Sequence, residues 1–311
     1  MKKKKPKTIK NAECDSRDNT VAIAEKTGDE NATPPRDEID IQLDELAITP
    51  SVKKQRVWEV DFVRGLMILF VVWDHFMWDV RYIDTELYNT GLFKWLYDLA
   101  GSYYSGALRQ VTQPVFVTMF VFTSGVSCSF SRSNGRRAIK MVIFAFLFTA
   151  VTAAISAIIG QNLTINFNVI HVIALSVLLW TAIEWCRKYC VKNWQKNVFG
   201  VTMTAVILAV LITGACANTS PWVNESEIWF FLAQHDGSVK GFSNFTGADY
   251  LPFFPDFGWF LVGAFLGKLL YKEKKSAFPS VNPKYVAPIT FCGRYSIWVY
   301  FGSQIVMYGF V

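Results

Sequence analysis

The sequence contains few charged residues for its length. Only 18% of its 311 residues are Asp, Glu, Lys or Arg, whereas a soluble domain has about a quarter. Apolar residues make up 52% of the chain and aromatic residues 16%. An apolar excess of this size needs a nonaqueous solvent, so the composition indicates a membrane protein.

Several motifs that mark common active sites are also missing. The chain has no Gly-rich phosphate loop, no His-x-x-x-His pair, no nucleophile-elbow Ser and no aromatic-basic patch. We therefore expect neither nucleic acid nor a metal as a ligand. The six cysteines lie mostly in or beside apolar segments, where thiols behave as small hydrophobes, so no disulfide framework is expected. Cys186 and Cys190 are one helical turn apart, which alone is a weak metal signal.

Residues 1–55 differ in composition from the rest of the chain. They hold 11 Lys/Arg and 11 Asp/Glu with almost no aromatic residue. Because such a segment buries too little apolar surface to offset chain entropy, we expect a disordered polar tail. No apolar run follows the basic start closely enough for a cleaved signal peptide, so the first span should serve as an uncleaved anchor.

Apolar windows recur through residues 56–311. A spanning helix needs about 20 mostly apolar residues. Windows of that kind lie near residues 57–79, 108–130, 138–159, 167–186, 197–217, 253–271 and 291–311. The sequence thus predicts an all-α, polytopic bundle of about seven transmembrane helices. The aromatic stretch Leu92–Tyr104 could add an interfacial helix, and Gly263 and Gly267 should let another helix pack closely on the sixth span.

Lys and Arg alternate between the loops that join these windows. The loops 131–140, 187–196 and 268–284 are rich in them, whereas 160–166 and 218–256 are poor. Positive charge in short loops favours the cytoplasmic side. The three basic loops and the N-terminus are therefore predicted to be cytoplasmic.

The first span carries a stripe of ionisable residues. Asp61, Arg64, His75 and Asp79 fall within roughly 60° of one another around the helix, and Asp74 points about 80° away. Such residues are costly inside a membrane and usually mark function. Asp61 and Arg64 lie toward the cytoplasmic side, and Arg64 is about 16 Å along the helix axis from His75. They form either a structural ion pair or a cofactor contact, and the sequence leaves both open.

Two further groups are predicted at the depth of His75, in the outer half of the membrane. His171 enters from the outer side in the fourth span, and Asp256 stands at the outer mouth of the sixth. A His and a carboxylate in a partly dry cleft can supply a base or a nucleophile. A lone His more often makes an interhelical hydrogen bond, but three such groups at one depth favour a site. His235, in a polar outer loop, is expected to be solvent-exposed.

The densest cationic cluster follows the second span. Its members are Arg132, Arg136, Arg137 and Lys140. These side chains could hold the phosphates of a nucleotide-like cofactor. Membrane topology explains the cluster about as well.

The first span also resembles a known family. RVWEVDFVRGLMILFVVWDHF is similar to the opening of the heparan-alpha-glucosaminide N-acetyltransferase catalytic-domain family, whose bacterial members have Asp-x-x-Arg-Gly followed by a His. The match covers Asp61, Arg64, Gly65, Asp74 and His75. FVFTSGVSCSFSR, NVIHVIALSVLL, DFGWFLVGAFLGKLLY and GRYSIWVYFGSQ resemble the second, fourth and last two spans.

The resemblance implies a membrane acyltransferase that takes an acyl group from cytosolic acyl-CoA, such as acetyl-CoA. The acceptor would be a sugar amine or hydroxyl, for example of a glycan, outside a bacterial cytoplasmic membrane. Relatives commonly place a His three residues after the Tyr of the last span, whereas Ser303 follows Tyr300 here. That departure puts activity in question. A homo-oligomer is compatible with the sequence.

Within this hypothesis, the polar residues take distinct roles. His75, assisted by Asp74 or His171, is the general base or a transient acyl acceptor. Asp79 and Asp256 bind the acceptor. Binding of acyl-CoA is assigned to Asp61, Arg64, Arg132, Arg136, Arg137 and Lys140. The alternative function is a proton-coupled transporter that uses the intramembrane His and Asp groups as a relay.

Overall fold

The computed structural model describes residues 57–82, 89, 91–160, 162–190, 196–217, 225, 227–235, 238, 242–247 and 249–310. Within these residues the chain is helical, and the only strand-like pairing is an isolated bridge between Phe167 and Tyr250. The predicted all-α bundle is confirmed. The prediction of a disordered tail falls on residues outside the described part.

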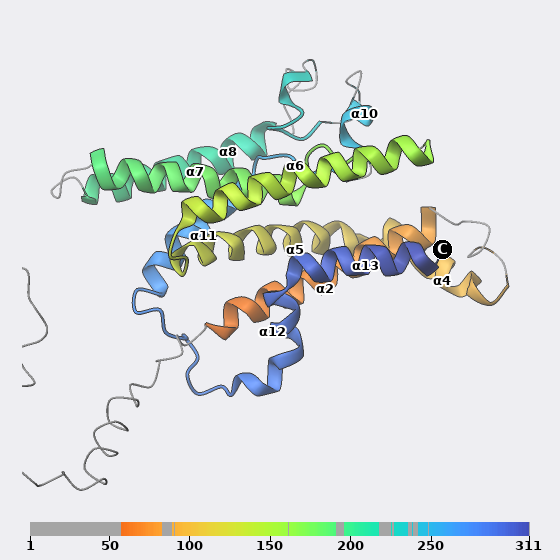
Figure 1. The fold of residues 1–311 in the computed structure, drawn as a ribbon, viewed down its shortest axis with the longest axis horizontal. Helices are drawn as coiled ribbons and strands as arrows, with labels where there is room; N and C mark the ends of the chain where they lie inside the picture. The colour runs from red at the N-terminus through yellow and green to blue at the C-terminus, as the bar shows by residue number, and fades with distance from the viewer. Residues whose placement is uncertain are drawn as a thin grey trace, which may run out of the picture. The chain divides into compact units, whose positions relative to one another are not determined.

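The long helices follow the apolar windows closely (Figure 1). They are α2 (Trp58–Tyr82), α5 (Ala107–Val126), α6 (Asn134–Ile159), α7 (Val169–Cys190), α8 (Lys196–Ala217), α11 (Asp256–Leu270) and α13 (Ser296–Phe310). The shorter elements are η2 (Gly91–Phe93), α4 (Lys94–Ser105), η3 (Ser127–Ser129), η5 (Glu227–Trp229), α10 (Phe242–Thr246), η6 (Pro283–Val286) and α12 (Ala287–Arg294). The expected aromatic helix near Leu92–Tyr104 is α4.

The number of membrane crossings stays a prediction. Among the described residues, four helices, α5 to α8, are long and apolar enough to cross a membrane. Helix α2 has 25 residues but carries several charges. Helices α11 and α13 have 15 residues each, or about 22 Å, which is shorter than the hydrocarbon core of a bilayer.

The last predicted span, 291–311, is not one continuous helix. Helix α12 ends at Arg294 and α13 begins at Ser296. A Cβ on Gly65 of α2 would collide with the backbone of Ile289, and one on Gly293 would collide with the backbone of Asp61. The two helices therefore touch backbone to backbone just before the break. The apolar pattern could not reveal this break because both halves are apolar.

A second close crossing joins α5 and α11. A Cβ on Gly263 would meet the carbonyl of Phe122, and one on Gly267 would come within 2.9 Å of the Val126 Cα. Gly125 of α5 faces the Phe260 backbone in return. The predicted packing role of Gly263 and Gly267 is confirmed.

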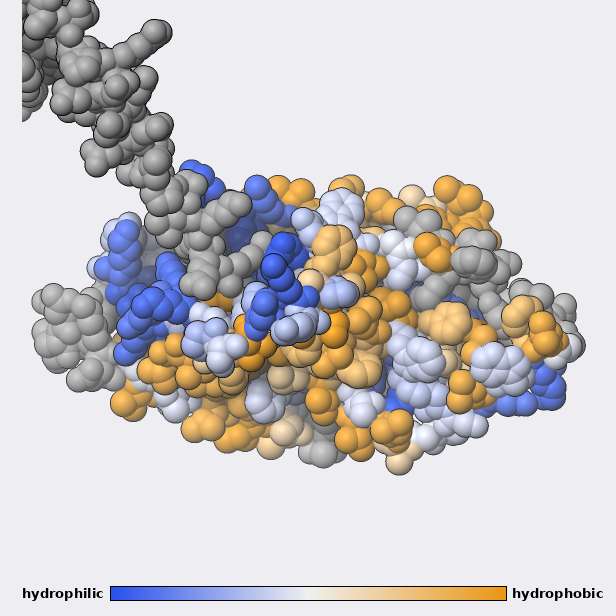
Figure 2. Space-filling model, turned by 90° about the horizontal axis from the view of Figure 1, so that it is seen from below, coloured by the Kyte–Doolittle hydropathy of each residue, from blue (hydrophilic) through white to orange (hydrophobic). Residues whose placement is uncertain are grey.

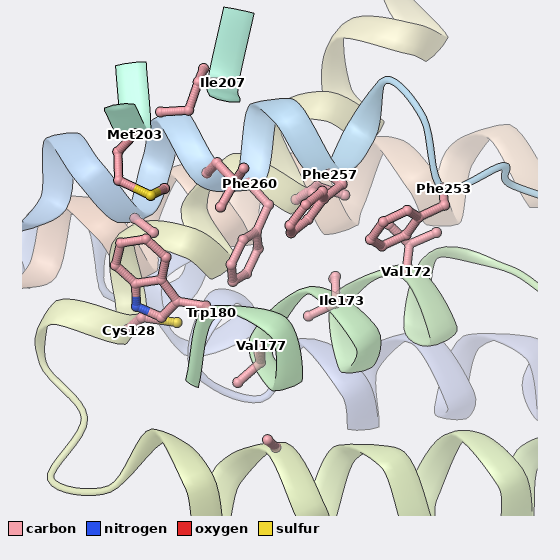
Figure 3. Packing of buried hydrophobic residues seen from close by; sticks show 14 of the residues in the cluster. Cys128, Val172, Ile173, Val177, Trp180, Met203, Ile207, Phe253, Phe257 and Phe260 are labelled. Atoms are coloured by element: carbon pink, nitrogen blue, oxygen red, sulfur yellow. The ribbon is translucent and has the colours of Figure 1, made fainter. Parts of the chain in front are cut away.

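The largest apolar core lies where α5, α7, α8 and α11 meet. Phe257, Phe260 and Leu261 of α11 pack there against Trp180 of α7 (Figure 3). Helices α6 and α8 bury only a narrow face, since 11% and 17% of their most apolar windows are buried. The exposed side chains of α6 and α8 include many large apolar residues. Apolar residues also cover much of the face seen from below in Figure 2. Such a surface suits contact with lipid.

Contacts show which helix ends lie together. Arg64, near the start of α2, meets Ser127 after α5, and Glu184 near the end of α7 pairs with Lys268 near the end of α11. The three Lys/Arg-rich loops leave the bundle from this end, which we call the basic end. The other end of α2, which finishes at Tyr82, is called the opposite end.

Candidate functional site

A cavity of about 340 Å³ lies among α2, α5 and α13, which run alongside one another in Figure 1. Segments 165–170 and 249–251 complete its wall. Its apolar lining includes Ile68, Val71, Phe116, Phe120 and Phe301, and its polar lining includes Asp74, His75, Asp79, Arg109, Gln113, Asp249, Tyr300 and Gln304. The cavity combines an apolar interior with a few convergent polar groups, as ligand sites commonly do.

His75 faces Tyr300 within this cavity. The His75 Nδ1 lies 2.9 Å from the carbonyl oxygen of Val71, one turn earlier in α2. Because a carbonyl can only accept, Nδ1 carries the proton in the neutral ring. Nε2 then presents its lone pair toward the Tyr300 hydroxyl at 3.3 Å, with the rings edge to face. The geometry thus leaves the basic nitrogen of His75 in the cavity wall, with the Tyr300 hydroxyl as its partner.

Asp74 does not orient His75. Its carboxylate accepts two hydrogen bonds from Arg109, at 2.8 and 3.2 Å, and one from the Tyr103 hydroxyl at 3.0 Å. The Arg109 guanidinium also lies over the Tyr104 ring, 4.1 Å from its centre. The predicted assistance from Asp74 is therefore replaced by a role in tying α2 to α4 and α5. In the sequence, the only indication of the Asp74–Arg109 pair is that Arg109 stands alone just inside a predicted span.

Asp79 and Gln304 each present an atom without a hydrogen-bond partner. Asp79 is only 5% exposed, and its Oδ2 has no partner among the described residues. The same holds for the Gln304 Nε2. Both side chains line the cavity, one helical turn beyond His75 and Tyr300 respectively. An acceptor oxygen and a donor nitrogen thus remain for a ligand.

The segment after α10 supplies part of the wall that sequence reasoning missed. Asp249 accepts a hydrogen bond from the side chain of Asn168 at 3.1 Å. Burial raises the pKa of the neighbouring Tyr250, whose hydroxyl donates to the carbonyls of Phe230 and Ala233. Tyr250 therefore acts as a fixed, neutral support for the loop. Asp249 lies in a loop of mixed polarity, where no sequence pattern separates it from solvated acids.

His171 is placed differently from the prediction. Its Nε2 lies 2.9 Å from the Thr149 hydroxyl and its Nδ1 lies 2.9 Å from the side-chain oxygen of Asn168. Both ring nitrogens are thus occupied, and His171 is not among the residues that line the cavity. The expected meeting of His75 and His171 there does not occur, because His171 turns toward α6.

Two other sequence expectations also need correction. Asp256 is buried against α5, with the Thr118 hydroxyl 3.5 Å from its Oδ1, and it does not line the cavity. His235 was expected to be exposed but is only 5% exposed, and its ring stands edge to face with Phe230.

Toward the basic end, one turn beyond the cavity, Arg64 joins α2 to α5. Its guanidinium donates to the Thr123 carbonyl at 3.2 Å and to the Ser127 hydroxyl. Asp61 is buried, with its Oδ2 3.9 Å from the Nε of Arg294. The two open interpretations of Asp61 and Arg64 are therefore both compatible with this geometry.

The predicted cationic cluster divides into two kinds of residue. Arg132, Arg136 and Lys140 are exposed. Arg137 is half-buried and donates to the Ser124 carbonyl at 3.4 Å and to the Cys128 sulfur at 3.7 Å. Because both acceptors are neutral, the charge of Arg137 remains available to an anion.

Ser303, which stands where relatives commonly have a His, does not take over a polar contact in the cavity. Its hydroxyl donates to the carbonyl of Tyr300 at 2.7 Å, within α13. The described site therefore relies on His75 alone for an imidazole.

A helix bundle with an apolar surface and a cavity among its helices is typical of an integral membrane protein. The family model described as heparan-alpha-glucosaminide N-acetyltransferase, catalytic, matches residues 56–305, and the chain belongs to this family. Membership implies a membrane acetyltransferase. Comparison with curated proteins gave no match, and neither did comparison with solved structures.

Proposed function

We propose that the protein transfers an acyl group, an acetyl group first of all, from acyl-CoA to an amine or hydroxyl of a sugar-sized acceptor. The observation that best supports this proposal is that the Nε2 of His75 lies in the wall of a cavity inside the bundle, with its lone pair toward the Tyr300 hydroxyl. The family name itself describes acetyl transfer to the nitrogen of a glucosaminide. The acceptor of this chain is inferred to be of similar size.

The chemistry that the cavity supports is direct transfer. The acceptor nitrogen or oxygen attacks the thioester carbonyl carbon while its proton passes to His75 Nε2. The carbon–sulfur bond then breaks, and the protonated imidazole returns the proton to the departing sulfur. Tyr300 holds the ring of His75 in position through its hydroxyl. Our proposal gives no reacting-atom role to His171 or Asp256.

The donor is proposed to come from the basic end, which we place in the cytosol. Arg137 and the exposed side chains of Arg132, Arg136 and Lys140 offer positive charge to its phosphates. Asp61 and Arg64 lie between this cluster and the cavity. The acceptor is proposed to enter from the opposite end, outside a bacterial cytoplasmic membrane, where Asp79 lines the cavity.

The activity is tested by incubating the full chain in nanodiscs with radiolabelled acetyl-CoA and glucosamine. We expect labelled N-acetylglucosamine to form, and free CoA to appear in equal amount. If glucosamine and a panel of neutral sugars all stay unlabelled, acyl transfer to sugars is wrong.

The donor side is tested by replacing Arg136 and Lys140 with Gln. We expect a rise in KM for acetyl-CoA of about tenfold with little change in kcat, because only phosphate attraction is lost. The matched control replaces Lys274 and Lys275, two exposed lysines of another loop at the basic end. An equal rise in KM for the control would show that general surface charge, rather than this cluster, attracts the donor.

The orientation of the chain in the membrane is tested with fusions to alkaline phosphatase, which is active only outside the cytoplasm. A fusion after Lys140 should be inactive, and one after Asn162 should be active. The reverse pattern would invert the proposed sides of donor and acceptor.

A further inference from the structure

Charge is distributed unequally over the polar lining of the cavity. Three carboxylates, of Asp74, Asp79 and Asp249, line it together with the guanidinium of Arg109. Arg109 is held by two hydrogen bonds to Asp74 and by the ring of Tyr104, so these two charges neutralise each other. Among the described residues, neither of the other two carboxylates pairs with a Lys or Arg. The cavity therefore carries an excess of negative charge toward the opposite end.

The unpartnered atoms lie on the same side of His75. Asp79 follows His75 by four residues in α2, and Gln304 follows Tyr300 by four residues in α13. Four residues make about one helical turn, or 6 Å along the axis. The Asp79 Oδ2 and the Gln304 Nε2 thus form a second polar layer, one turn farther from the basic end than the His75–Tyr300 pair.

This layer is complementary to a particular kind of group. The Asp79 oxygen needs a hydrogen-bond donor, and the Gln304 nitrogen needs an acceptor. A hydroxyl group of a sugar supplies both, and adjacent hydroxyl and ammonium groups do so as well. A phosphate, sulfate or carboxylate would satisfy Gln304 but would bring its negative charge against Asp79 and Asp249.

We propose that Asp79, Asp249 and Gln304 form the acceptor subsite and select sugar-sized acceptors that are neutral or cationic, excluding those with an anionic group beside the reacting atom. This inference rests on the proposed acyl transfer. Asp79 and Asp249 are the specificity-determining residues in it, because they repel an anionic group, and Gln304 contributes a hydrogen bond to any acceptor. The volume of about 340 Å³ admits one monosaccharide together with the acyl group.

The test compares glucosamine with glucosamine 6-phosphate, which differ by one phosphate. Binding to the detergent-purified full chain is followed by the thermal unfolding midpoint without any CoA compound, so the readout does not depend on catalysis. We expect glucosamine to raise the midpoint and to bind roughly 100-fold more tightly than its phosphate, because like charges repel strongly in a partly dry site. Equal stabilisation by the two sugars, or by neither, would overturn the subsite.

Variants identify the residues responsible. Asp79→Asn and Asp249→Asn should each reduce the discrimination between the two sugars by about tenfold, and Gln304→Leu should weaken glucosamine binding while keeping the discrimination. The control is Asp98→Asn, since Asp98 is exposed on α4 and pairs with Lys94 away from the cavity. Unchanged discrimination in both carboxylate variants would contradict the proposal. Should the binding pattern appear without acetyl transfer to glucosamine, the subsite stands and the proposed chemistry fails.

Discussion

The two histidines inside the helix bundle have opposite surroundings. His171 has a hydrogen-bond partner on each ring nitrogen, Thr149 on one and Asn168 on the other. His75 uses Nδ1 on its own helix and turns Nε2 toward Tyr300 and the cavity. Both imidazoles are thus hydrogen-bonded at each nitrogen, but the Nε2 partner of His75, the Tyr300 hydroxyl, lines the cavity, where a ligand can replace it and give up a proton to Nε2. The hydrogen-bond partners, rather than depth in the membrane, separate the two roles.

The carboxylates near the two histidines also differ in whether they have a charged partner. Asp74, next to His75 in sequence, is neutralised by Arg109, whereas Asp79 one turn later keeps an unpartnered oxygen. Near His171, Asp249 is bonded to the amide of Asn168 but still lines the cavity. On α2, an acid paired with Arg109 and an acid with an unpartnered oxygen thus lie five residues apart.

The largest expected effect comes from replacing the two histidines in turn. His75→Ala should lower kcat by roughly 100- to 10,000-fold, the range usual for loss of a general base, while leaving expression nearly unchanged. His171→Ala should change kcat by less than tenfold but lower the thermal unfolding midpoint, because it leaves Thr149 and Asn168 without their buried partner. Acetyl transfer and thermal unfolding are measured on both purified variants.

The assignment of different roles to His75 and His171 would be contradicted if the two variants behaved alike. A His171→Ala protein that folds with the wild-type midpoint but has lost transfer activity would make His171 the base. A His75→Ala protein with wild-type kcat would remove the imidazole from the mechanism altogether.

Sequence patterns predicted the helices well but only part of the site. Apolar windows located each long helix, and the spacing of Gly263 and Gly267 indicated a close crossing that the structure contains. The polar stripe of α2 correctly pointed to a cavity lined by His75 and Asp79. Periodicity describes one helix at a time, so it gives the face of a residue but not its partner on another helix.

The misplaced residues illustrate this limit. His171 and Asp256 were grouped with His75 because their depths agree, but rotation about each helix axis directs them elsewhere. Arg109 and Gln304 were missed because a single polar residue in an apolar helix has no pattern of its own. The place of Asp249 depends on the pairing of Leu251 with Phe167, two residues far apart in sequence, which no local signal encodes.

A smaller effect is expected at the Asp74–Arg109 pair, and it concerns stability. Asp74→Ala leaves the Arg109 guanidinium, whose side chain is 26% exposed, without its carboxylate and should lower the free energy of unfolding by about 3 kcal/mol. Asp98→Ala is the matched control, because the Lys94–Asp98 pair is more than half exposed and should contribute less than about 0.5 kcal/mol. Unfolding in mixed SDS micelles measures both. Equal losses would show that the buried pair has no special structural role, and Asp74 would return as a candidate partner of His75.

The smallest effect is expected from a change at Tyr300. This change tests whether the Nε2 of His75 is the atom that accepts the proton. Tyr300→Phe removes the hydroxyl 3.3 Å from Nε2 but keeps the ring that packs edge to face on the imidazole. Because one neutral hydrogen bond contributes about 1 kcal/mol, kcat should fall by about tenfold or less, with the unfolding midpoint close to wild type. Tyr295→Phe, at an exposed ring one turn earlier in the chain, provides the control. A loss as large as that of His75→Ala would instead make the Tyr300 hydroxyl a direct participant in proton transfer, and the lone pair of His75 would then act through it.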